Sequence, residues 1–510
     1  MKISPNELKR GFQELKNDAR NHFNNNKIEA SISRILESTT IAAQFNFIYA
    51  DDELELLQND ISKEIFGELY KQNIETNENR VVFIDEFCTS YVLALQYIQA
   101  LVTAQKEILY ICARDVENMK FKNILNTIKD YPCLTIKLVD TTKSNIRAIK
   151  EVNKLIIDFA PDKILLHLYP KTIIPIALYA LPSNITKYII NLADQTFWLG
   201  AKVIDYTLEF RQFGAAVSMQ RRGLKKEQCL LIPFYPTVDN NTYEGLPKTS
   251  SDQVILFTGG DFYKTIDKDQ TFWNLIKTIL IENPKVIFFY AIKGFRPSDL
   301  NFVDKFIKDN NFEERFIYIG FRSDINEVFA HCDIYFGTCP ASGSLMSQLA
   351  AINAKPILQY YYPNTPDDET DSVICYNSKT KILFTNKAEL LSEAKRLIND
   401  SDSRVKRGQE LKKAMITVEQ FNSLVRRTIE TNKTQIEIEN NYSVDYELLD
   451  RRWLDIEYND FIDTISCFYQ LLGSLECRKR LYSIYLKYNY NRFIKNKLLN
   501  FSWYKYKLYK

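Results

Sequence analysis

Short apolar runs alternate with amphipathic segments in two long blocks of this 510-residue chain, and this alternation constrains the fold more than any other feature. The first block starts near Arg80 and the second at Val254. A strand, a helix and another strand at such spacing predict parallel βαβ units, because two neighbouring parallel strands need a crossover connection. The two blocks therefore predict two doubly wound α/β domains.

The segments outside the two blocks have a different composition. A polar stretch with helical periodicity precedes the first block, the turn-rich stretch TVDNNTYEGLPKTSSDQ separates the blocks, and charged helical patterns follow the second. We accordingly expect five parts: a helical extension at 1–76, a Rossmann-like domain at 77–236, a linker at 237–253, a second Rossmann-like domain at 254–402, and a helical region with a basic aromatic tail at 403–510.

Charge and cysteine content exclude several classes of protein. Lys and Arg number 66 against 64 Asp and Glu, so the net charge of +2 indicates no particular partner. The nine cysteines form no CxxC pair, which argues against a disulfide framework and a zinc site. The sequence shows neither the apolar core of a signal peptide nor the roughly 20 apolar residues of a spanning helix. We expect a cytoplasmic protein that needs no cofactor.

The segment GTCPASGSLMSQLAAINAKPI, from Gly337 to Ile357, joins a strand-like run to a helix-like run through small residues. In open α/β sheets, ligands bind beyond the carboxyl ends of the strands, where the free N–H groups of a helix start attract anions. Ser342, Gly343 and Ser344 fall at the expected first turn of that helix. They predict a diphosphate site, and the alternative is an ordinary N-cap.

A second small-residue turn follows the first strand of the same block. In VILFTGGDFYKT, Gly259 and Gly260 follow the strand, and Lys264 supplies a cation for phosphate oxygens. Arg322 lies in the loop after a later strand and adds a second cation. The turn matches neither GxGxxG nor GxxxxGK[ST], which disfavours a dinucleotide oxidoreductase and a P-loop NTPase. Lys264 as a plain surface lysine is the alternative.

These features together resemble the nucleotide-sugar-binding half of GT-B glycosyltransferases, in particular the group 1-like enzymes of bacterial glycan biosynthesis. The resemblance covers about 254–400 by motif and 80–236 by architecture alone. It implies two Rossmann-like domains that face a cleft, here with helical extensions at both ends. It also implies that the first domain binds the acceptor and the second binds the donor.

The resemblance assigns a set of residues to the donor. Gln348 occupies the position where many such enzymes keep an acidic residue against the ribose. Retaining members often carry two glutamates where this chain has Pro340 and Gln348, so an inverting transfer is expected. The acidic stretch 367–369 is expected either to close over the donor sugar or to form a surface turn. The predicted donor residues are Thr258, Gly259, Gly260, Lys264, Arg322, Ser342, Gly343, Ser344 and Gln348.

An inverting transfer needs a general base, which we expect in the first domain. His167 in KILLHLYP and Asp194 in YIINLADQTFWLG follow successive predicted strands and should lie at the same sheet edge. Imidazole titrates closest to neutral pH. Asp194 ranks first because its loop continues through Gly200, as if built around a ligand. The alternatives are a structural histidine and a helix-capping aspartate.

Neither a metal nor a cofactor is expected. The DxD sequence Asp267–Asp269 does not follow an apolar strand and is interpreted as a solvated turn. Lys264, Arg322 and the helix start would stabilise the leaving nucleoside diphosphate.

The predicted function is transfer of a sugar, of the hexosyltransferase type, from a nucleotide sugar to a hydroxyl of a glycan, glycolipid or protein, as in polysaccharide biosynthesis. The alternatives are a nucleotide-sugar epimerase of the same fold and a noncatalytic scaffold. Basic and aromatic residues interleave in the last part, 478–510, which predicts either peripheral contact with the inner face of a membrane or a helical extension packed on the second domain. A nucleic-acid partner is not expected.

Overall fold

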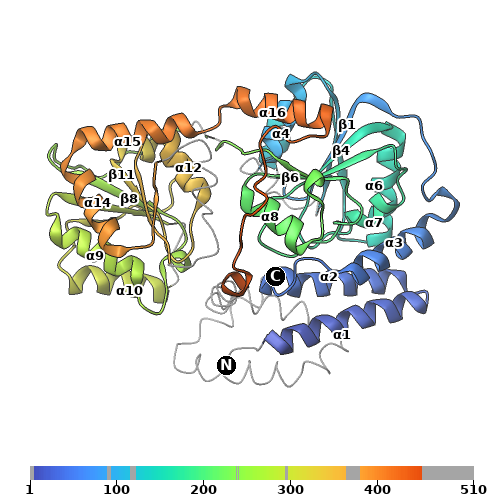
Figure 1. Ribbon diagram of the computed structural model, residues 1–510, viewed down its shortest axis with the longest axis horizontal. Helices are drawn as coiled ribbons and strands as arrows, with labels where there is room; N and C mark the ends of the chain where they lie inside the picture. Colours follow the sequence, from blue (N-terminus) through green and yellow to red (C-terminus); the bar gives the residue numbers. More distant parts are fainter. Residues whose placement is uncertain are drawn as a thin grey trace.

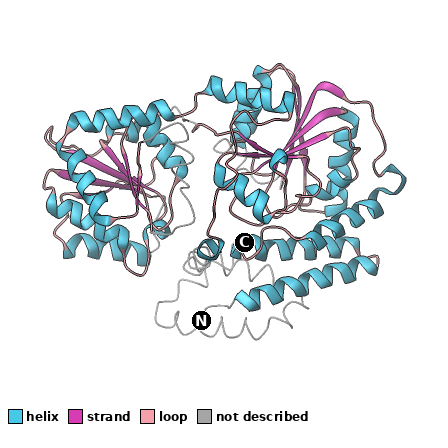
Figure 2. Ribbon diagram, viewed as in Figure 1, coloured by secondary structure: helices cyan, strands magenta, loops and turns pink. Residues whose placement is uncertain are grey.

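The computed structural model describes residues 5–88, 93–114, 122–236, 238, 241–292, 297–362 and 380–450. Within these ranges the chain forms two separate parallel sheets, each covered by helices on both faces (Figure 1, Figure 2). The prediction of two doubly wound α/β domains is therefore confirmed.

The first sheet has seven parallel strands in the order β3-β2-β1-β4-β5-β6-β7. Its central strand β1 is buried from Val81 to Asp85, as expected for a strand with helices on both faces. Its strands are β1 (Asn77–Asp85), β2 (Glu107–Ala113), β3 (Leu134–Val139), β4 (Pro161–His167), β5 (Thr186–Ile190), β6 (Tyr206–Glu209) and β7 (Cys229–Leu231). Its helices are α4 (Ala94–Thr103), α5 (Lys122–Ile128), α6 (Asn145–Phe159), α7 (Ile174–Tyr179) and α8 (Gln212–Arg221).

The second sheet has six parallel strands in the order β10-β9-β8-β11-β12-β13. Strand β9 is buried throughout, and the fully buried Trp273 fills the core beside it. The strands are β8 (Val254–Gly259), β9 (Val286–Ala291), β10 (Phe316–Tyr318), β11 (Ile334–Phe336), β12 (Ile357–Tyr360) and β13 (Leu383–Phe384). The helices are α9 (Thr271–Glu282), α10 (Pro297–Asp309), α11 (Ile325–His331), α12 (Ser344–Ile352), α14 (Lys387–Asn399) and α15 (Ser401–Ala414).

The helical prefix packs on the first sheet and shares its core. It consists of α1 (Pro5–Asn24), α2 (Ile28–Phe45) and α3 (Asp52–Phe66). Leu54 and Leu57 belong to the same apolar cluster as the strands. The Glu29 carboxylate of α2 accepts hydrogen bonds from the backbone N–H groups of Asn145 (2.6 Å) and Ile146 (3.1 Å), and so caps the start of α6.

The last described helix returns from the second sheet to the first. Figure 1 shows α15 against the second sheet and α16 (Val418–Thr431) beside α4. The Phe421 ring of α16 lies 5.2 Å from the Tyr97 ring of α4, and both side chains are buried. The basic aromatic tail at 478–510, for which we expected either a membrane contact or a helical extension packed on the second domain, lies outside the described residues. No helix in the described ranges has both the length and the apolar composition needed to cross a bilayer.

Candidate functional site

Each sheet has one position where the strand order reverses direction, and loops that leave neighbouring strands there create a crevice for ligands. In the first sheet this position lies between β1 and β4, and in the second between β8 and β11. Asp85 and His167 end β1 and β4 and are register partners. Gly259 ends β8, and the predicted small-residue loop begins one residue after β11. The predicted residues therefore concentrate at both reversal points.

The glycine turn after β8 lies directly against the start of α12. A Cβ on Gly259 would stand 2.3 Å from the Met346 methyl carbon. Gly260 has φ +145°, which residues with side chains rarely adopt, and its N–H donates to the Ala291 carbonyl at 3.1 Å. The Thr258 hydroxyl donates to the Phe336 carbonyl at 2.6 Å, so it links β8 to β11.

Lys264 connects this turn to the small-residue loop. It lies in a 3-10 turn, Phe262–Thr265, and its Nζ donates to the Ser342 carbonyl at 3.4 Å. The Ala341 N–H donates to the Lys264 carbonyl, also at 3.4 Å. The structure thus brings together the glycine turn, Lys264 and the loop at 342–344.

Helix α12 begins at Ser344 with Gly343 as its N-cap, at the position predicted from the sequence. Among the described residues, no side-chain hydrogen bond caps its first turn, and the first backbone N–H groups face the loop. One turn further, Gln348 is fully buried and its Nε2 donates to the Phe234 carbonyl of the first domain at 3.2 Å. Its Oε1 has no hydrogen-bond partner among the described residues.

Arg322 does not join this group in the structure. Its guanidinium forms two hydrogen bonds with the Asp324 carboxylate, at 2.7 and 2.6 Å, and a third with the Gly245 carbonyl at 2.7 Å. The hydrogen bond with Asp324 raises the pKa of Arg322 and lowers that of Asp324. Arg322 therefore fixes the linker to the second domain in this conformation.

The carboxyl edge of the first sheet faces the second domain. Phe210, which follows β6, packs on an apolar cluster that contains Leu349 and Ala350 of α12. The hydrogen bond from Gln348 to the Phe234 carbonyl also joins α12 to the first domain. The segments that follow β6 and β7 of the first sheet therefore contact α12, which starts at the carboxyl edge of the second sheet.

His167 forms a buried chain of hydrogen bonds at the first reversal point. Its Nδ1 lies 2.9 Å from Asp85 Oδ1, and the Tyr110 hydroxyl donates to Asp85 Oδ2 at 2.8 Å. An ionised carboxylate only accepts, so Nδ1 donates in this hydrogen bond, and in the neutral imidazole the lone pair is then on Nε2. Nε2 is buried and has no hydrogen-bond partner among the described residues. The Phe87 ring covers the imidazole at 4.5 Å between ring centres.

Glu86, next to Asp85, is a buried carboxyl with an unusual protonation state. Burial raises the pKa of Glu86 to about 8, and the neighbouring Asp85 adds to the shift. The opposing influences are hydrogen bonds from the Thr172 hydroxyl at 2.7 Å and the Tyr169 N–H at 2.9 Å. Near neutral pH, most Glu86 side chains are therefore protonated and neutral.

Asp194 is fully buried and engaged by two arginines. Both of its carboxylate oxygens accept from the Arg211 guanidinium, at 2.6 and 2.8 Å, and its carbonyl accepts from Arg222 at 2.8 Å. Glu209 lies beside this pair and accepts from Asn191, Thr207 and Ser218. A carboxylate held by both oxygens in this way is poorly placed to take a proton from a substrate.

The acidic sequence Asp267–Asp269 directly precedes the N-cap of α9, Gln270. Asp267 Oδ1 accepts from the N–H groups of Asp269 (2.8 Å) and Thr271 (3.1 Å). In the described part of the chain, no three His, Cys, Asp or Glu side chains are grouped as metal ligands would be. The acidic stretch 367–369, expected either to close over the donor sugar or to form a surface turn, lies outside the described residues.

The sequence interpretation missed Asp85, Glu86 and Phe87. All three are in the run VVFIDEF, where β1 ends, so two acidic residues directly after an apolar strand gave a visible signal. Their pairing with His167 and Thr172, more than eighty residues away, was not visible because it depends on which strand lies beside β1.

No protein-family model matches the chain, and no curated protein matches it. Several solved structures do. A mutant of the Thermobaculum terrenum O-GlcNAc transferase superposes with a TM-score of 0.50 at 12% identity, over 89% of this chain and 88% of that protein. Anabaena HepE in complex with UDP has a TM-score of 0.50 at 13% identity, over 69% of this chain and all of that protein. These likenesses establish the fold, which is GT-B.

Proposed function

From the GT-B fold of this chain, we propose that it is a glycosyltransferase that moves a sugar from a nucleotide-sugar donor to a hydroxyl of a glycan, glycolipid or protein. The observation that carries the proposal is the contact between the glycine turn after β8, Lys264 and the start of α12. Close backbone approach, free helical N–H groups and an ammonium group together suit a diphosphate. HepE was solved with UDP, so uridine donors are the first to test.

In this proposal the second sheet stabilises the leaving nucleoside diphosphate. Lys264 and the first turn of α12 supply positive potential where negative charge develops, without a bound metal. Gly259 and Gly260 let the phosphates approach the backbone, where a Cβ would intrude. Gln348 offers amide hydrogen bonds to the donor hydroxyls near its present contact with Phe234.

We assign the general base to His167 and a positioning role to Asp85. The acceptor hydroxyl gives its proton to Nε2 while its oxygen attacks the anomeric carbon, and the bond from that carbon to the diphosphate oxygen breaks. Attack from the face opposite the leaving group inverts the configuration. Nε2 is buried, so side chains around it must move for an acceptor to reach it. We ranked Asp194 first from the sequence, and the two hydrogen bonds that its oxygens accept from Arg211 favour His167 in this proposal.

The donor site is tested by release of nucleotide from a panel of nucleotide sugars in the presence of EDTA. We expect release from one donor by wild type, and a loss of about tenfold or more for Lys264→Ala. The matched control is Lys268→Ala, which removes an exposed lysine from the same loop. Equal activity of the two variants would contradict the donor site.

Two other outcomes would favour the alternative functions. Conversion of the donor to an epimer without net release of nucleotide would favour an epimerase. A nucleotide-dependent rise in melting temperature without turnover of any donor would favour a binding protein.

The base assignment is tested with His167→Gln, in which an amide replaces the imidazole. We expect turnover to fall about 10²- to 10⁴-fold, whereas stabilisation of the protein by the nucleotide stays unchanged. The control is His331→Gln, because His331 is exposed on α11. Wild-type turnover by His167→Gln would assign the proton transfer to another group.

A further inference from the structure

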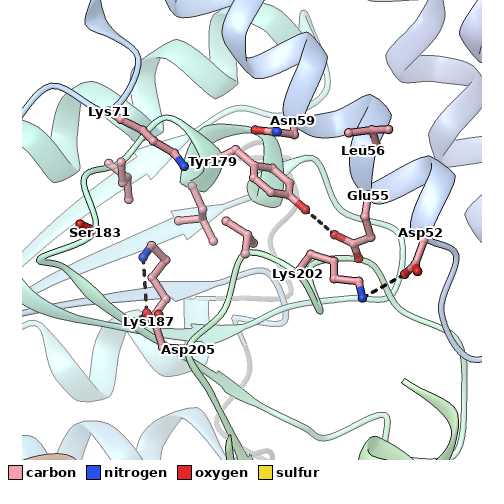
Figure 3. A pocket seen from close by; sticks show the side chains of 13 residues that line it. Asp52, Glu55, Leu56, Asn59, Lys71, Tyr179, Ser183, Lys187, Lys202 and Asp205 are labelled. Atoms are coloured by element: carbon pink, nitrogen blue, oxygen red, sulfur yellow. Dashed lines mark hydrogen bonds and ion pairs between the residues drawn. The ribbon is translucent and has the colours of Figure 1, made fainter. Parts of the chain in front are cut away.

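A cavity of about 520 Å³ opens at the amino edge of the first sheet, away from the reversal points (Figure 3). One face of α3 forms one wall, and the chain segments that lead into β5 and β6 form the other. Lys187 lies at the start of β5 and Asn191 just beyond its end, so the strand separates the cavity from the carboxyl edge by roughly 13 Å. The size is within the usual range for small-molecule sites.

The acidic side of this cavity is structural. The fully buried Glu55 accepts from the N–H groups of Gly200 (2.6 Å) and Ala201 (3.0 Å) and from the Tyr179 hydroxyl (2.7 Å). These bonds fasten α3 to the loop before β6. At the rim, Lys202 pairs with Asp52 at 3.2 Å, and both side chains are at least half exposed.

The opposite side of the cavity carries two lysines, Lys71 and Lys187, and one aspartate, Asp205. Figure 3 shows the ammonium groups of Lys71 and Lys187 on the same side as Ser183. Lys187 is buried, and its Nζ donates to the Ile185 carbonyl at 2.8 Å and to Asp205 at 3.4 Å, which leaves one of its three donors.

The backbone of Lys71 is fixed by a hydrogen bond, whereas its ammonium group is not neutralised by a described carboxylate. Its N–H donates to the Ala180 carbonyl at 2.7 Å. Its Nζ lies 5.4 Å from the centre of the Tyr70 ring and forms no ion pair or hydrogen bond with any described residue. Lys71 thus presents an unneutralised ammonium group to the cavity, beside a buried lysine.

We propose that this cavity binds a small phosphomonoester with a polyhydroxylated body, of the size of a sugar phosphate. The phosphate lies between Lys71, Lys187 and Ser183, because two ammonium groups and a hydroxyl suit a doubly charged oxyanion. The body of the ligand covers the apolar floor, and its hydroxyls reach Asn59 and Asp52 on the α3 wall. The floor consists of Leu178, Leu181 and Val203.

Isothermal titration of the full chain with glucose-6-phosphate tests the proposal, with free glucose and inorganic phosphate as separate probes. We expect wild type to bind glucose-6-phosphate more tightly than either fragment, and Lys71→Ala to weaken binding about tenfold or more. Lys202→Ala, a control at the acidic rim of the same cavity, should change binding less than about twofold.

The same titration on Lys264→Ala separates this cavity from the proposed donor site. Retained binding by Lys264→Ala supports the cavity at α3, even if the donor assignment fails. Loss of binding in Lys264→Ala with retention in Lys71→Ala would place the probe at the second sheet and overturn the proposal. Absence of binding to wild type would overturn it as well.

Discussion

At the carboxyl edge of the first sheet, ionisable side chains are buried in pairs and networks, whereas the same edge of the second sheet is made mainly of small residues and backbone groups. At the first edge, the Arg211 guanidinium donates two hydrogen bonds to the Asp194 carboxylate, and His167 is hydrogen-bonded to Asp85. The second edge exposes the start of α12 and a glycine turn. Both edges occupy the same place in the same topology.

This difference has a physical consequence. A buried charge is costly unless it is paired, so the first edge depends on every partner for its stability. Backbone N–H groups at a helix start are fixed by the fold itself and need no partner while water reaches them. The first edge therefore suits side chains with a fixed geometry and protonation state, and the second suits an exchangeable anion.

Among substitutions that test this difference between the two edges, we expect the largest loss of stability at Arg211. In Arg211→Met the Asp194 carboxylate stays buried without the two hydrogen bonds from that guanidinium, so the free energy of unfolding should fall by about 3–5 kcal/mol in chemical denaturation. Arg221→Met, on the exposed part of α8, removes a guanidinium that contacts the Tyr446 side chain and lies near Asp450, and should cost less than about 1 kcal/mol.

A second substitution shows whether the loss comes from the buried charge. Asp194→Asn together with Arg211→Met removes both charges and should recover part of the lost stability. If Arg211→Met costs no more than Arg221→Met, the ionic network of the first edge does not stabilise the fold.

An intermediate effect is expected in the pH dependence of stability. The pKa of Glu86 is raised to about 8 in the folded state, from an ordinary value near 4.5, so between these values the folded chain keeps a proton that the unfolded chain has lost. The free energy of unfolding should therefore fall as pH rises from 5 to 8, by up to about 1.4 kcal/mol per pH unit.

Glu86→Gln should remove that contribution, because an amide does not titrate. Urea denaturation of wild type and variant across this pH range measures the difference, and Glu78→Gln, at the exposed start of the same strand, is the control. Parallel curves for wild type and Glu86→Gln would show that Glu86 is ionised in the folded protein.

The smallest effect is expected at the second edge. In Gly343→Ala the new methyl group meets its nearest neighbours, atoms of Met346, at 3.8 Å, so stability should change by less than about 1 kcal/mol. Affinity for a nucleotide, measured by thermal shift, should fall because the methyl group narrows the proposed phosphate site. In Gly337→Ala the methyl group would stand 2.3 Å from Gln359 Oε1, so that control should lose clearly more stability. If Gly343→Ala lowered the free energy of unfolding as much as Arg211→Met does, the two edges would not differ in how they depend on their side chains.

The local patterns of the sequence were sufficient to predict much of the second edge. Alternating apolar runs predicted the strands. Small residues before LMSQLAAINA predicted a helix start, which the structure places at Ser344. Lys264 was expected near that start and contacts its loop. Arg322 was expected there too, but Asp324 and Gly245 hold it elsewhere. A lysine and an arginine after strands look alike in sequence, and only their neighbours in space distinguish them.

By itself, the sequence determined the two parallel sheets and the placement of polar residues at strand ends, because these follow from periodicity and turn residues over short distances. The tertiary structure decided which side chains pair. Strand β4 lies beside β1, which brings His167 to Asp85 across 82 positions of sequence. It also decided that the prefix completes the core of the first sheet and encloses the cavity at Lys71. Such contacts depend on strand order and helix packing, which no local pattern encodes.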